Sequence, residues 1–381
     1  MRSRNIGISW QLSDRHGWGV FGYNLVVNLI QNGPLPPALL TPPSFIGIPE
    51  ETANKIESYV IESADLEMRL PQMTLLHSLG LDFHENEATR HIRARANIAF
   101  SFFEETGFAP DAVSRARDWD RLLVGSSWNK DICTSFGISN VAFVSQGVDT
   151  TRFTPSPKRG TPSGRFVVFS GGKLEYRKGQ DLVLAAFKNF HARHPDSLLI
   201  TAWQNNWTQS ARSIAQSPHI TESPEVSSDG QIRITEWAVA NGVPANAFVD
   251  LGWVSNARMP AILNEVDVAV FPSRCEGGTN LVAMEAMASG VACILSNNTG
   301  HLDIINGNKN CYPLLQQNSV EQGSRAEWRE SDVDEITEAM ETAYQHSEDR
   351  LTRGEEATAS MAELSWKHQT RVLTDQIHHY L

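Results

Sequence analysis

The sequence has few cysteines, more acidic than basic residues and no long apolar run. Its four cysteines lack CxxC spacing, which indicates reduced thiols rather than a disulfide or zinc framework. The longest apolar runs, such as Val266 to Phe271, have the length of a strand, whereas a membrane helix needs about 20 apolar residues. The N-terminal residues contain no adequate apolar region before Asp14. We therefore expect a cytoplasmic protein without a cleaved secretory signal.

The charge balance argues against one broad class of partner. The formal net charge is −12, and general nucleic-acid binding needs a basic surface that neutralises phosphates. The same charge weakens adhesion to anionic lipid. One local exception is the basic run from Arg90 to Arg95. This run is either a solvated helix face or a contact with an anionic acceptor or a membrane surface.

Strand-like apolar runs alternate with helical stretches along the chain. At 381 residues the chain is too long for one ordinary core, and we expect two domains. Alternating strands and helices predict parallel sheets covered on both faces, and hence an α/β protein with two Rossmann-like lobes facing across a cleft. Among the expected elements are helices at Val20 to Asn32, Glu50 to Arg69 and Gln180 to Arg193, and strands at Asn5 to Trp10, Met73 to His77, Ile98 to Phe103, Phe166 to Ser170, Val266 to Phe271 and Ala292 to Ser296.

The best linker is a loop rich in Pro, Ser, Arg and Gly, Thr154 to Arg165. We place the domain boundary there, with an N-terminal lobe at residues 1–155 and a C-terminal lobe at residues 166–360. In the second lobe, the polar stretch Gln204 to Ile234 is expected to be a long surface excursion. Ligands of such sheets bind outside the carboxyl ends of the strands, so the cleft between the lobes is the expected site.

The segment Phe271 to Gly290 joins an apolar strand to an apolar helix through a glycine-containing loop. Backbone N–H groups can converge at the first turn of such a helix, where free donors and the positive end of the dipole favour a phosphate. The alternative is that Asn280 is only an N-cap and Glu285 only a glutamate favoured by the dipole. The expected ligand-binding residues of this segment are Gly277, Gly278, Thr279, Asn280, Leu281 and Glu285.

A second loop, Gly171 to Gly179, also follows a strand. Its cations, Lys173 and Lys178, can bracket a diphosphate next to Gly172 and neutralise the charge that grows as the diphosphate departs, an effect of a few kcal/mol for each cation. The alternative is a solvated basic loop. Because the two lysines do the work of a divalent cation, and no histidine spacing predicts a metal site, we expect neither a metal nor another cofactor.

A third loop, Asp14 to Gly19, opens the first helix. Gly17 and Gly19 either let the backbone approach a ligand closely or form a simple turn. Trp18 between them is unusual for a turn that only reverses the chain. Since sugars stack well on indole faces, Trp18 is a candidate wall for a sugar acceptor.

Together these motifs resemble the donor site of the retaining glycosyltransferases of family 4, also called glycosyl transferases group 1, which have the GT-B architecture. The family pattern is a glutamate, seven residues and a second glutamate. This chain has Glu276 and Glu285 with eight residues between them. Gly277 and Gly278 can absorb the additional residue as a bulge-like loop. A second departure is Lys173, which stands where the family has an arginine that holds the donor's diphosphate.

The resemblance implies a reaction and a role for each residue. The protein is expected to move a sugar from a nucleotide-diphosphate-sugar donor to an acceptor hydroxyl, with retention and without metal, in glycan, polysaccharide or glycolipid assembly. Lys173 and Lys178 would hold the diphosphate, Glu276 would contact the transferred sugar, and Glu285 would bind the ribose. His77 is the candidate for the catalytic histidine that the family often has in its first lobe, and the alternative is a structural histidine.

The resemblance extends to the end of the chain. Leu364-Ser365-Trp366 resembles the start of the family's final helix, which implies that residues 361–381 pack back on the N-terminal lobe. Trp18 and Glu105 are the candidates on the acceptor side, and the expected acceptor is a glycan or a lipid-linked sugar at the inner membrane face.

Two other functions remain open at this point. A nucleotide-sugar epimerase of the same architecture would need acid and base carboxylates in the cleft. A catalytically degenerate glycan-binding or scaffold protein is kept open by the lengthened glutamate spacing and the missing arginine.

Overall fold

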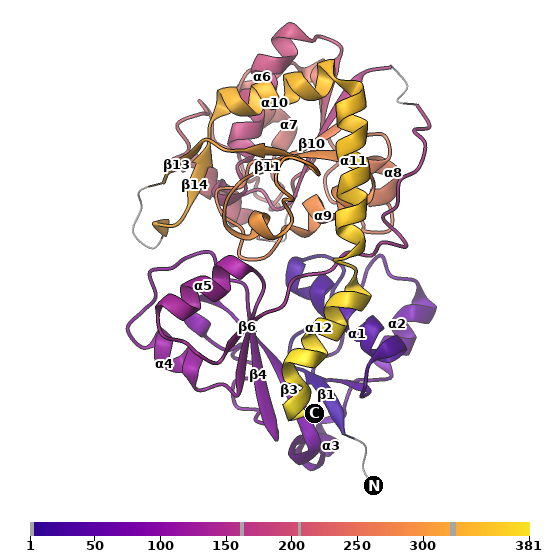
Figure 1. The fold of residues 1–381 in the computed structure, drawn as a ribbon, viewed down its shortest axis with the longest axis vertical. Coiled ribbons are helices and arrows are strands. Elements are labelled where there is room, and N and C mark those ends of the chain that lie inside the picture. The colour runs from indigo at the N-terminus through magenta and orange to yellow at the C-terminus, as the bar shows by residue number, and fades with distance from the viewer. Residues whose placement is uncertain (1–3, 161–163, 205–206, 321–324) are drawn as a thin grey trace.

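The computed structural model describes residues 4–160, 164–204, 207–320 and 325–381. It contains two six-stranded sheets, one in each half of the chain, and every pair of neighbouring strands within them is parallel. Figure 1 shows the two halves as separate lobes stacked along the long axis of the molecule. The predicted architecture of two Rossmann-like lobes is confirmed.

The N-terminal lobe is built on the sheet β2-β1-β3-β4-β5-β6. Its central strands are buried almost without interruption, as expected where helices cover both faces. The strands are β1 (Asn5–Ile8), β2 (Pro37–Leu39), β3 (Met73–Leu79), β4 (Ala96–Ser101), β5 (Arg121–Val124) and β6 (Val141–Phe143), and the helices are α1 (Gly17–Asn32), α2 (Glu50–Glu57), α3 (Ser63–Arg69), α4 (Ala112–Arg117) and α5 (Ser127–Ser135).

The C-terminal lobe is built on the sheet β12-β11-β10-β7-β8-β9. A short antiparallel pair, β13 (Gln317–Ser319) and β14 (Arg329–Ser331), lies beside it. The strands of the large sheet are β7 (Phe166–Gly171), β8 (Ser197–Ala202), β9 (Phe248–Asp250), β10 (Val268–Phe271), β11 (Ala292–Ser296) and β12 (Tyr312–Leu314), and the helices are α6 (Gln180–Arg193), α7 (Ile234–Ala240), α8 (Met259–Leu263), α9 (Leu281–Ala288), α10 (Val333–Gln345) and α11 (Ser347–Ala362).

The last helix, α12 (Trp366–Ile377), follows the C-terminal lobe in sequence but packs on the N-terminal one. The chain crosses between the lobes beside Val148, whose amide donates to the Leu364 carbonyl (2.9 Å) and whose carbonyl accepts from the Trp366 amide (3.1 Å). Trp366 then packs on Phe21 of α1. Figure 1 shows this yellow helix against the indigo elements near the N-terminus.

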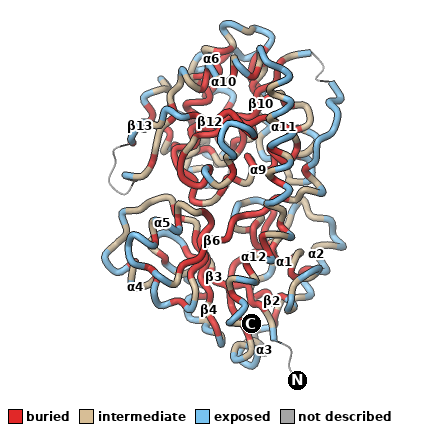
Figure 2. Tube along the Cα trace, in the orientation of Figure 1, coloured by how far each residue is buried: buried red, intermediate tan, exposed pale blue. Residues whose placement is uncertain are grey.

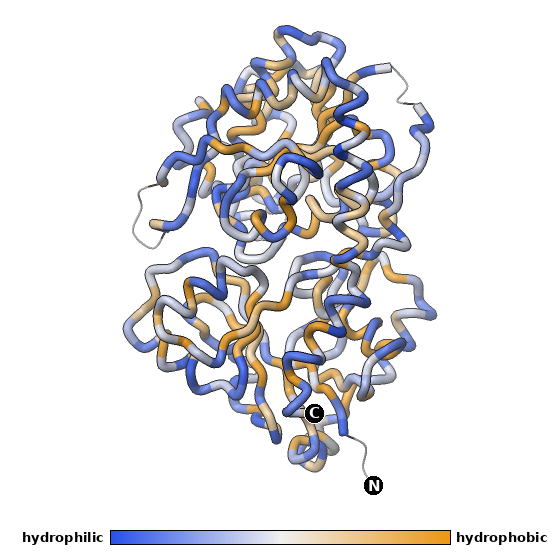
Figure 3. Tube along the Cα trace, viewed as in Figure 1, coloured by the Kyte–Doolittle hydropathy of each residue, from blue (hydrophilic) through white to orange (hydrophobic). Residues whose placement is uncertain are grey.

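Each sheet has a hydrophobic core on both of its faces. Figure 2 shows buried residues concentrated along the strands of both lobes, and Figure 3 shows that the same segments are the most hydrophobic. The four cysteines are buried free thiols. Within the described ranges, no helix combines the length and the apolar character that crossing a bilayer requires.

Several local expectations need correction. The first helix begins at Gly17 rather than Val20, because the His16 side chain caps it by accepting from the Gly19 amide (3.1 Å). The single helical stretch expected at 50–69 is divided between α2 and α3. The stretch Gln204 to Ile234 is not all surface, because a 3₁₀ segment there buries Ala211 and Ile214 completely. Residues 205–206 of this stretch and residues 161–163 of the expected linker lie outside the described residues.

Candidate functional site

A cavity of about 240 Å³ lies between the two lobes. Loops that follow the carboxyl ends of β7, β8 and β9 form its C-terminal wall together with the start of α9. The loop after β1 and the start of α1 form its N-terminal wall. The position agrees with the rule that ligands of open α/β sheets bind outside the carboxyl ends of the strands. Of the predicted residues, the cavity brings together Gly17, Gly172, Lys173, Leu281 and Glu285.

Two helix N-termini, one from each lobe, open onto this cavity. In α9 the Asn280 side chain accepts from the Ala283 amide, which leaves the first-turn amides of Leu281 and Val282 without a hydrogen bond from the described part of the chain. In α1 the His16 cap uses the Gly19 amide, and the Gly17 amide is left in the same way. Free first-turn amides and the positive ends of two helix dipoles make this cavity suited to an anion.

Lys173 brings an ammonium group to the cavity. Its ammonium lies 2.7 Å from Glu175 Oε2 and 5.8 Å from the ring centroid of Trp207. The side chain is 34% exposed, so it can contact a ligand in the cavity without leaving the protein core. Gly172 before it has a φ of 115°, a conformation that side-chain-bearing residues rarely adopt.

Glu285 is buried in the wall of the cavity, one turn into α9. Its Oε1 accepts a hydrogen bond of 2.6 Å from Asn256 Nδ2. Burial raises the pKa of Glu285 to about 8, and the Asn256 bond opposes this only in part. At neutral pH the group therefore holds its proton most of the time. A ligand that donates further hydrogen bonds to the carboxylate would lower this pKa.

Glu276 and Lys178 do not line the cavity, because they bind each other. The Lys178 ammonium is 2.8 Å from both carboxylate oxygens of Glu276, which also accepts from Arg177 (3.0 Å) and from Ser273 Oγ (2.6 Å). Burial opposes ionisation of Glu276, but Lys178 and Arg177 together lower its pKa to about 2. The predicted contacts of Glu276 with a sugar and of Lys178 with a diphosphate therefore need this ion pair to open.

Gly277 and Gly278, in the loop before α9, are required for a reason different from the predicted bulge. A Cβ atom at Gly277 would lie 2.7 Å from the Phe103 carbonyl oxygen, and one at Gly278 would lie 2.5 Å from Gln146 Oε1. Neither glycine has a positive φ, so close approach to the other lobe, and not a bulge, requires them. Gln146 also accepts from the Thr279 amide (3.2 Å).

Of the amides predicted to hold a phosphate, the cavity brings in that of Leu281. Gly277, Gly278 and Thr279 contact the N-terminal lobe and do not line the cavity, and their role in phosphate binding stays a prediction. Asn280 acts as the N-cap of α9, with its side-chain amide 3.2 Å from His301 Nε2.

Two further predicted residues lie away from the cavity. His77 is buried within β3, where its Nε2 lies 3.2 Å from Asn97 Oδ1 and its ring packs on Trp119. Burial lowers the pKa of His77 to about 4. These surroundings suit the alternative of a structural histidine, and the catalytic role of His77 stays a prediction. Gly19 does not line the cavity either, because its Cα packs tightly on Ser13, where a Cβ would lie 2.4 Å from the Ser13 Cβ.

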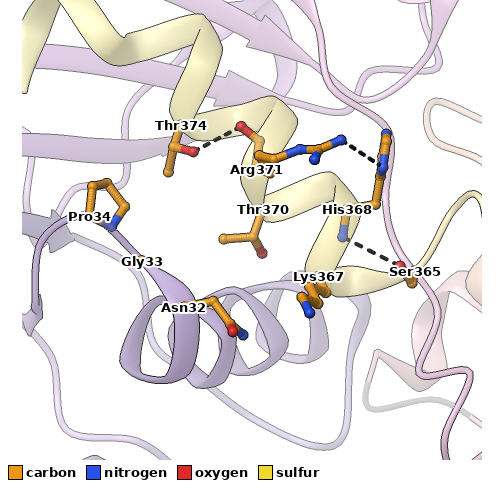
Figure 4. Close-up of a pocket in the computed structure, with 9 residues that line it drawn as sticks. All are labelled: Asn32, Gly33, Pro34, Ser365, Lys367, His368, Thr370, Arg371 and Thr374. Atoms are coloured by element: carbon orange, nitrogen blue, oxygen red, sulfur yellow. Dashed lines mark hydrogen bonds between the residues drawn. The ribbon is translucent and has the colours of Figure 1, made fainter.

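Trp18 and Glu105 line a second interlobe cavity, of about 350 Å³. Lys173 borders both cavities, so they adjoin each other. A separate cavity of about 390 Å³ lies at the seam of α1 and α12, where Arg371 and His368 face each other (Figure 4). None of the predicted site residues lines this third cavity.

Some residues of the site had no recognisable signal in the sequence. Arg15 of the N-terminal lobe stands over the Trp253 ring of the other lobe, 5.9 Å from its centroid. Arg274 is fully buried, pairs with Asp181 and Glu330 (2.6 Å each) and stacks on Tyr176 (3.7 Å). These partners lie far apart in sequence. Among the described residues, no group of three or more His, Cys, Asp or Glu side chains is placed to hold a metal ion.

Two Rossmann-like lobes with a cavity between them define the class of protein as one with the GT-B fold. The family model for glycosyl transferases group 1 matches residues 152–350, slightly more than half of the chain. The chain therefore belongs to this family. The match includes the loop after β7 and the segment around Glu276 and Glu285, which carried the resemblance in the sequence.

Individual relatives are distant. Glycogen synthase of Mycobacterium tuberculosis is 27% identical over 242 residues, which are 59% of this chain and 48% of that protein. A GDP-mannose-dependent alpha-(1-6)-phosphatidylinositol monomannoside mannosyltransferase of Mycolicibacterium smegmatis is 26% identical over 233 residues, 55% of this chain and 54% of that protein. The chain thus spans about half the length of the curated relatives it matches.

Among solved structures, sucrose-phosphate synthase from Thermosynechococcus elongatus superposes with a TM-score of 0.68. The superposition covers 99% of both chains at 13% sequence identity. At this identity the likeness concerns the fold, and it extends over both lobes.

Proposed function

We propose that this protein is a retaining glycosyltransferase that moves a sugar from a nucleotide-diphosphate-sugar donor to an acceptor hydroxyl without a metal ion. The observation that carries the proposal is the composition of the interlobe cavity. It combines the free amides of two helix N-termini, the Lys173 ammonium and the Glu285 carboxyl. The amides and the ammonium suit a diphosphate, and the carboxyl suits the hydroxyls of a ribose.

The cavity suggests one orientation for the donor. The diphosphate lies between the amides of Gly17 and Leu281 with Lys173 beside it, and the ribose hydroxyls donate to Glu285. The Trp253 indole, which is 41% exposed, offers an aromatic face to the nucleobase. The sugar then lies toward the adjoining second cavity.

Lys178 and Glu276 take their predicted roles only when the donor is bound. The diphosphate offers Lys178 a competing anion, which releases oxygens of Glu276 for the hydroxyls of the transferred sugar. Exchange of one carboxylate for a diphosphate keeps the buried ammonium paired throughout. Arg177, 3.0 Å from Glu276, keeps that carboxylate ionised during the exchange.

The reaction is proposed to occur on one face of the sugar. The bond between the anomeric carbon and the phosphate oxygen breaks, the acceptor oxygen bonds to the same carbon, and the hydroxyl proton passes to the departing phosphate. A double-displacement glycosidase instead uses two carboxyl groups about 5 Å apart. Among the described residues, the carboxyl groups that line the first interlobe cavity, where we place the donor, are those of Asp14 and Glu285. Asp14 already accepts from the Ile46 and Gly47 amides, so we do not propose a double displacement by these two groups.

The setting that we propose is the assembly of a polysaccharide, glycan or glycolipid in the cytoplasm. The names of the two relatives point to a glucan and to a lipid-linked mannoside as acceptors. In both cases the accepting group is a hydroxyl of a saccharide.

The first test is a thermal-shift screen against UDP, GDP, ADP, TDP and CMP with EDTA present. A ligand at 100 times its Kd adds about 2.7 kcal/mol to stability. We expect one nucleotide to raise the Tm of the wild type and to bind Lys173→Ala at least about tenfold more weakly, which is the weight of one charge-assisted hydrogen bond. Lys188→Ala, an exposed lysine on α6, is the matched control.

Each outcome separates the alternatives. If no nucleotide shifts the wild type, or if both lysine variants behave alike, the donor-site assignment is wrong. Nucleotide binding without turnover favours the glycan-binding scaffold, and conversion of the donor sugar without an acceptor favours the epimerase. An inverted anomeric configuration in the product, read by proton NMR, would remove the retaining mechanism from the proposal.

A further inference from the structure

The second interlobe cavity is walled by both lobes. Trp18, Leu81 and the segment Phe102 to Glu105 come from the N-terminal lobe, whereas Arg177 and Trp328 come from the C-terminal one. The lobes are held together here, because Trp328 Nε1 donates to the Glu104 carbonyl at 2.7 Å. The cavity therefore has a defined shape when the lobes are closed. It adjoins the donor cavity at Lys173.

Aromatic rings form much of the cavity wall. Trp18 packs edge-on against Phe102, with the ring centroids 4.9 Å apart, and Trp328 stacks on Tyr176 with the rings inclined by 29°. Carboxylates of Glu104 and Glu105 lie beside these rings. Aromatic faces that meet the C–H faces of a sugar, together with carboxylates that accept from its hydroxyls, are the two kinds of contact that bind saccharides.

The charges of the cavity wall are balanced and paired. Three acidic and three basic side chains line the cavity, and burial raises the pKa of one of the acidic groups, Glu104. Arg177 lies 2.6 Å from Glu175 and 3.5 Å from Glu104, Lys173 lies 2.7 Å from Glu175, and Arg325 lies 3.4 Å from Glu105. The first cavity adds the first-turn amides of Gly17 and Leu281 to Lys173, whereas neither residue lines this one. A phosphate here would depend on cations that already pair with carboxylates, so little net attraction would offset its loss of water.

We propose that this second cavity binds the acceptor, and that the accepting sugar unit is uncharged, carrying neither phosphate nor carboxylate. The proposal rests on the proposed glycosyltransferase function and adds the class of acceptor to it. Trp18 supplies the stacking face, and Glu104 and Glu105 orient the hydroxyls. Glu105 also disfavours anionic sugars, because it already forms an ion pair with Arg325.

The test measures binding of glucose, mannose and galactose and of their 6-phosphates by saturation-transfer NMR, each with and without the nucleotide that stabilises the protein. We expect at least one neutral sugar to bind the wild type at least tenfold more tightly than its 6-phosphate. Glu105→Gln keeps the shape of the wall but leaves Arg325, within the described part of the chain, with neutral partners, Gln216 (2.9 Å) and the Trp328 ring (4.7 Å). This variant should reduce the preference for the neutral sugar about tenfold, the effect of one charge-assisted hydrogen bond.

A second variant tests the location. Leu81 is 57% exposed in the cavity wall, so Leu81→Trp fills the cavity without disturbing a core. It should abolish sugar binding and leave nucleotide binding unchanged. Leu351→Trp, at a leucine that is 64% exposed on α11, is the matched control and should retain both.

The outcomes separate this proposal from the donor assignment. Preference of the wild type for a 6-phosphate, an unchanged preference in Glu105→Gln, or sugar binding that survives in Leu81→Trp would overturn it. So would the failure of all three neutral sugars to bind while a nucleotide binds. If no nucleotide binds, the donor assignment fails, but the measurements without nucleotide still test this cavity.

Discussion

Donor affinity should increase with pH through the titration of Glu285. Its carboxyl has a pKa of about 8 in the free protein. If ribose hydroxyls donate to the carboxylate, binding requires the ionised form, and the bound pKa falls toward the ordinary value of 4.5. At pH 7 only about one molecule in eleven is ionised, so the observed affinity lies about tenfold below its plateau above pH 9. This difference is about 1.4 kcal/mol.

The same residue has the opposite effect on stability. The folded-state pKa of Glu285 lies above its ordinary value, so its stabilising contribution is complete below about pH 4.5 and is lost as the pH rises through about 8. At pH 7 the loss is on the order of 3 kcal/mol. Glu285→Gln has no carboxyl to ionise. We therefore expect its Tm to exceed that of the wild type at pH 8.5 and to approach it at pH 5.

The assay is calorimetric titration with a nucleotide-sugar between pH 6.5 and 9, using the nucleotide found by thermal shift. A nucleotide-sugar is preferable to the free nucleotide because it lacks a terminal phosphate that titrates near pH 6. His16 in the same cavity does not interfere, since burial and Arg15 lower its pKa from 6.5. An affinity that falls with pH, or the same slope in Glu285→Gln, would refute the assignment of Glu285 as a carboxylate acceptor for ribose.

Two further variants test the packing that supports the site. Gly277→Ala places a methyl group 2.7 Å from the Phe103 carbonyl oxygen, so we expect a lower Tm and a larger radius of gyration by X-ray scattering, whereas Gly80→Ala, with 3.7 Å to its nearest neighbour, should change neither. Arg274→Met removes the cation shared by the buried Asp181 and Glu330 and should cost about 3–5 kcal/mol in denaturant unfolding. The double variant with Asp181→Leu should recover part of this loss, since Glu330 still lacks Arg274, and a single-variant loss below about 1 kcal/mol would contradict the importance of this cluster.

Much of the fold could be predicted because its signals are local. The helix Gln180–Arg193 and the strand Ala292–Ser296 have the predicted ends, since Gly179 and Gly290, both with positive φ, bound them. The buried part of the stretch Gln204 to Ile234 was missed. Its segment is a 3₁₀ helix, whose period is neither that of an α-helix nor that of a strand.

In the site, too, residues with a local sequence signal were predicted and residues that depend on distant partners were not. Lys173, Leu281 and Glu285 were found because each lies directly in a strand-to-helix segment that reaches the cavity by itself. The Lys178–Glu276 pair could not be predicted, since its members are 98 residues apart. The need for glycine at 277 was recognised, but its cause is a backbone oxygen in the other lobe, which no local pattern encodes.

The position of α12 has a consequence for synthesis of the protein on the ribosome. Domains usually fold in the order in which they emerge, N-terminal first. Here Trp366, Leu373 and Ile377 belong to the same core as Ile6 and Ile8 of β1. The first lobe to emerge is therefore the last to complete its core, and it waits for the whole second lobe to be translated. Nascent chains interrupted before residue 366 should carry an incomplete first lobe, which cellular proteases can recognise by its exposed apolar surface.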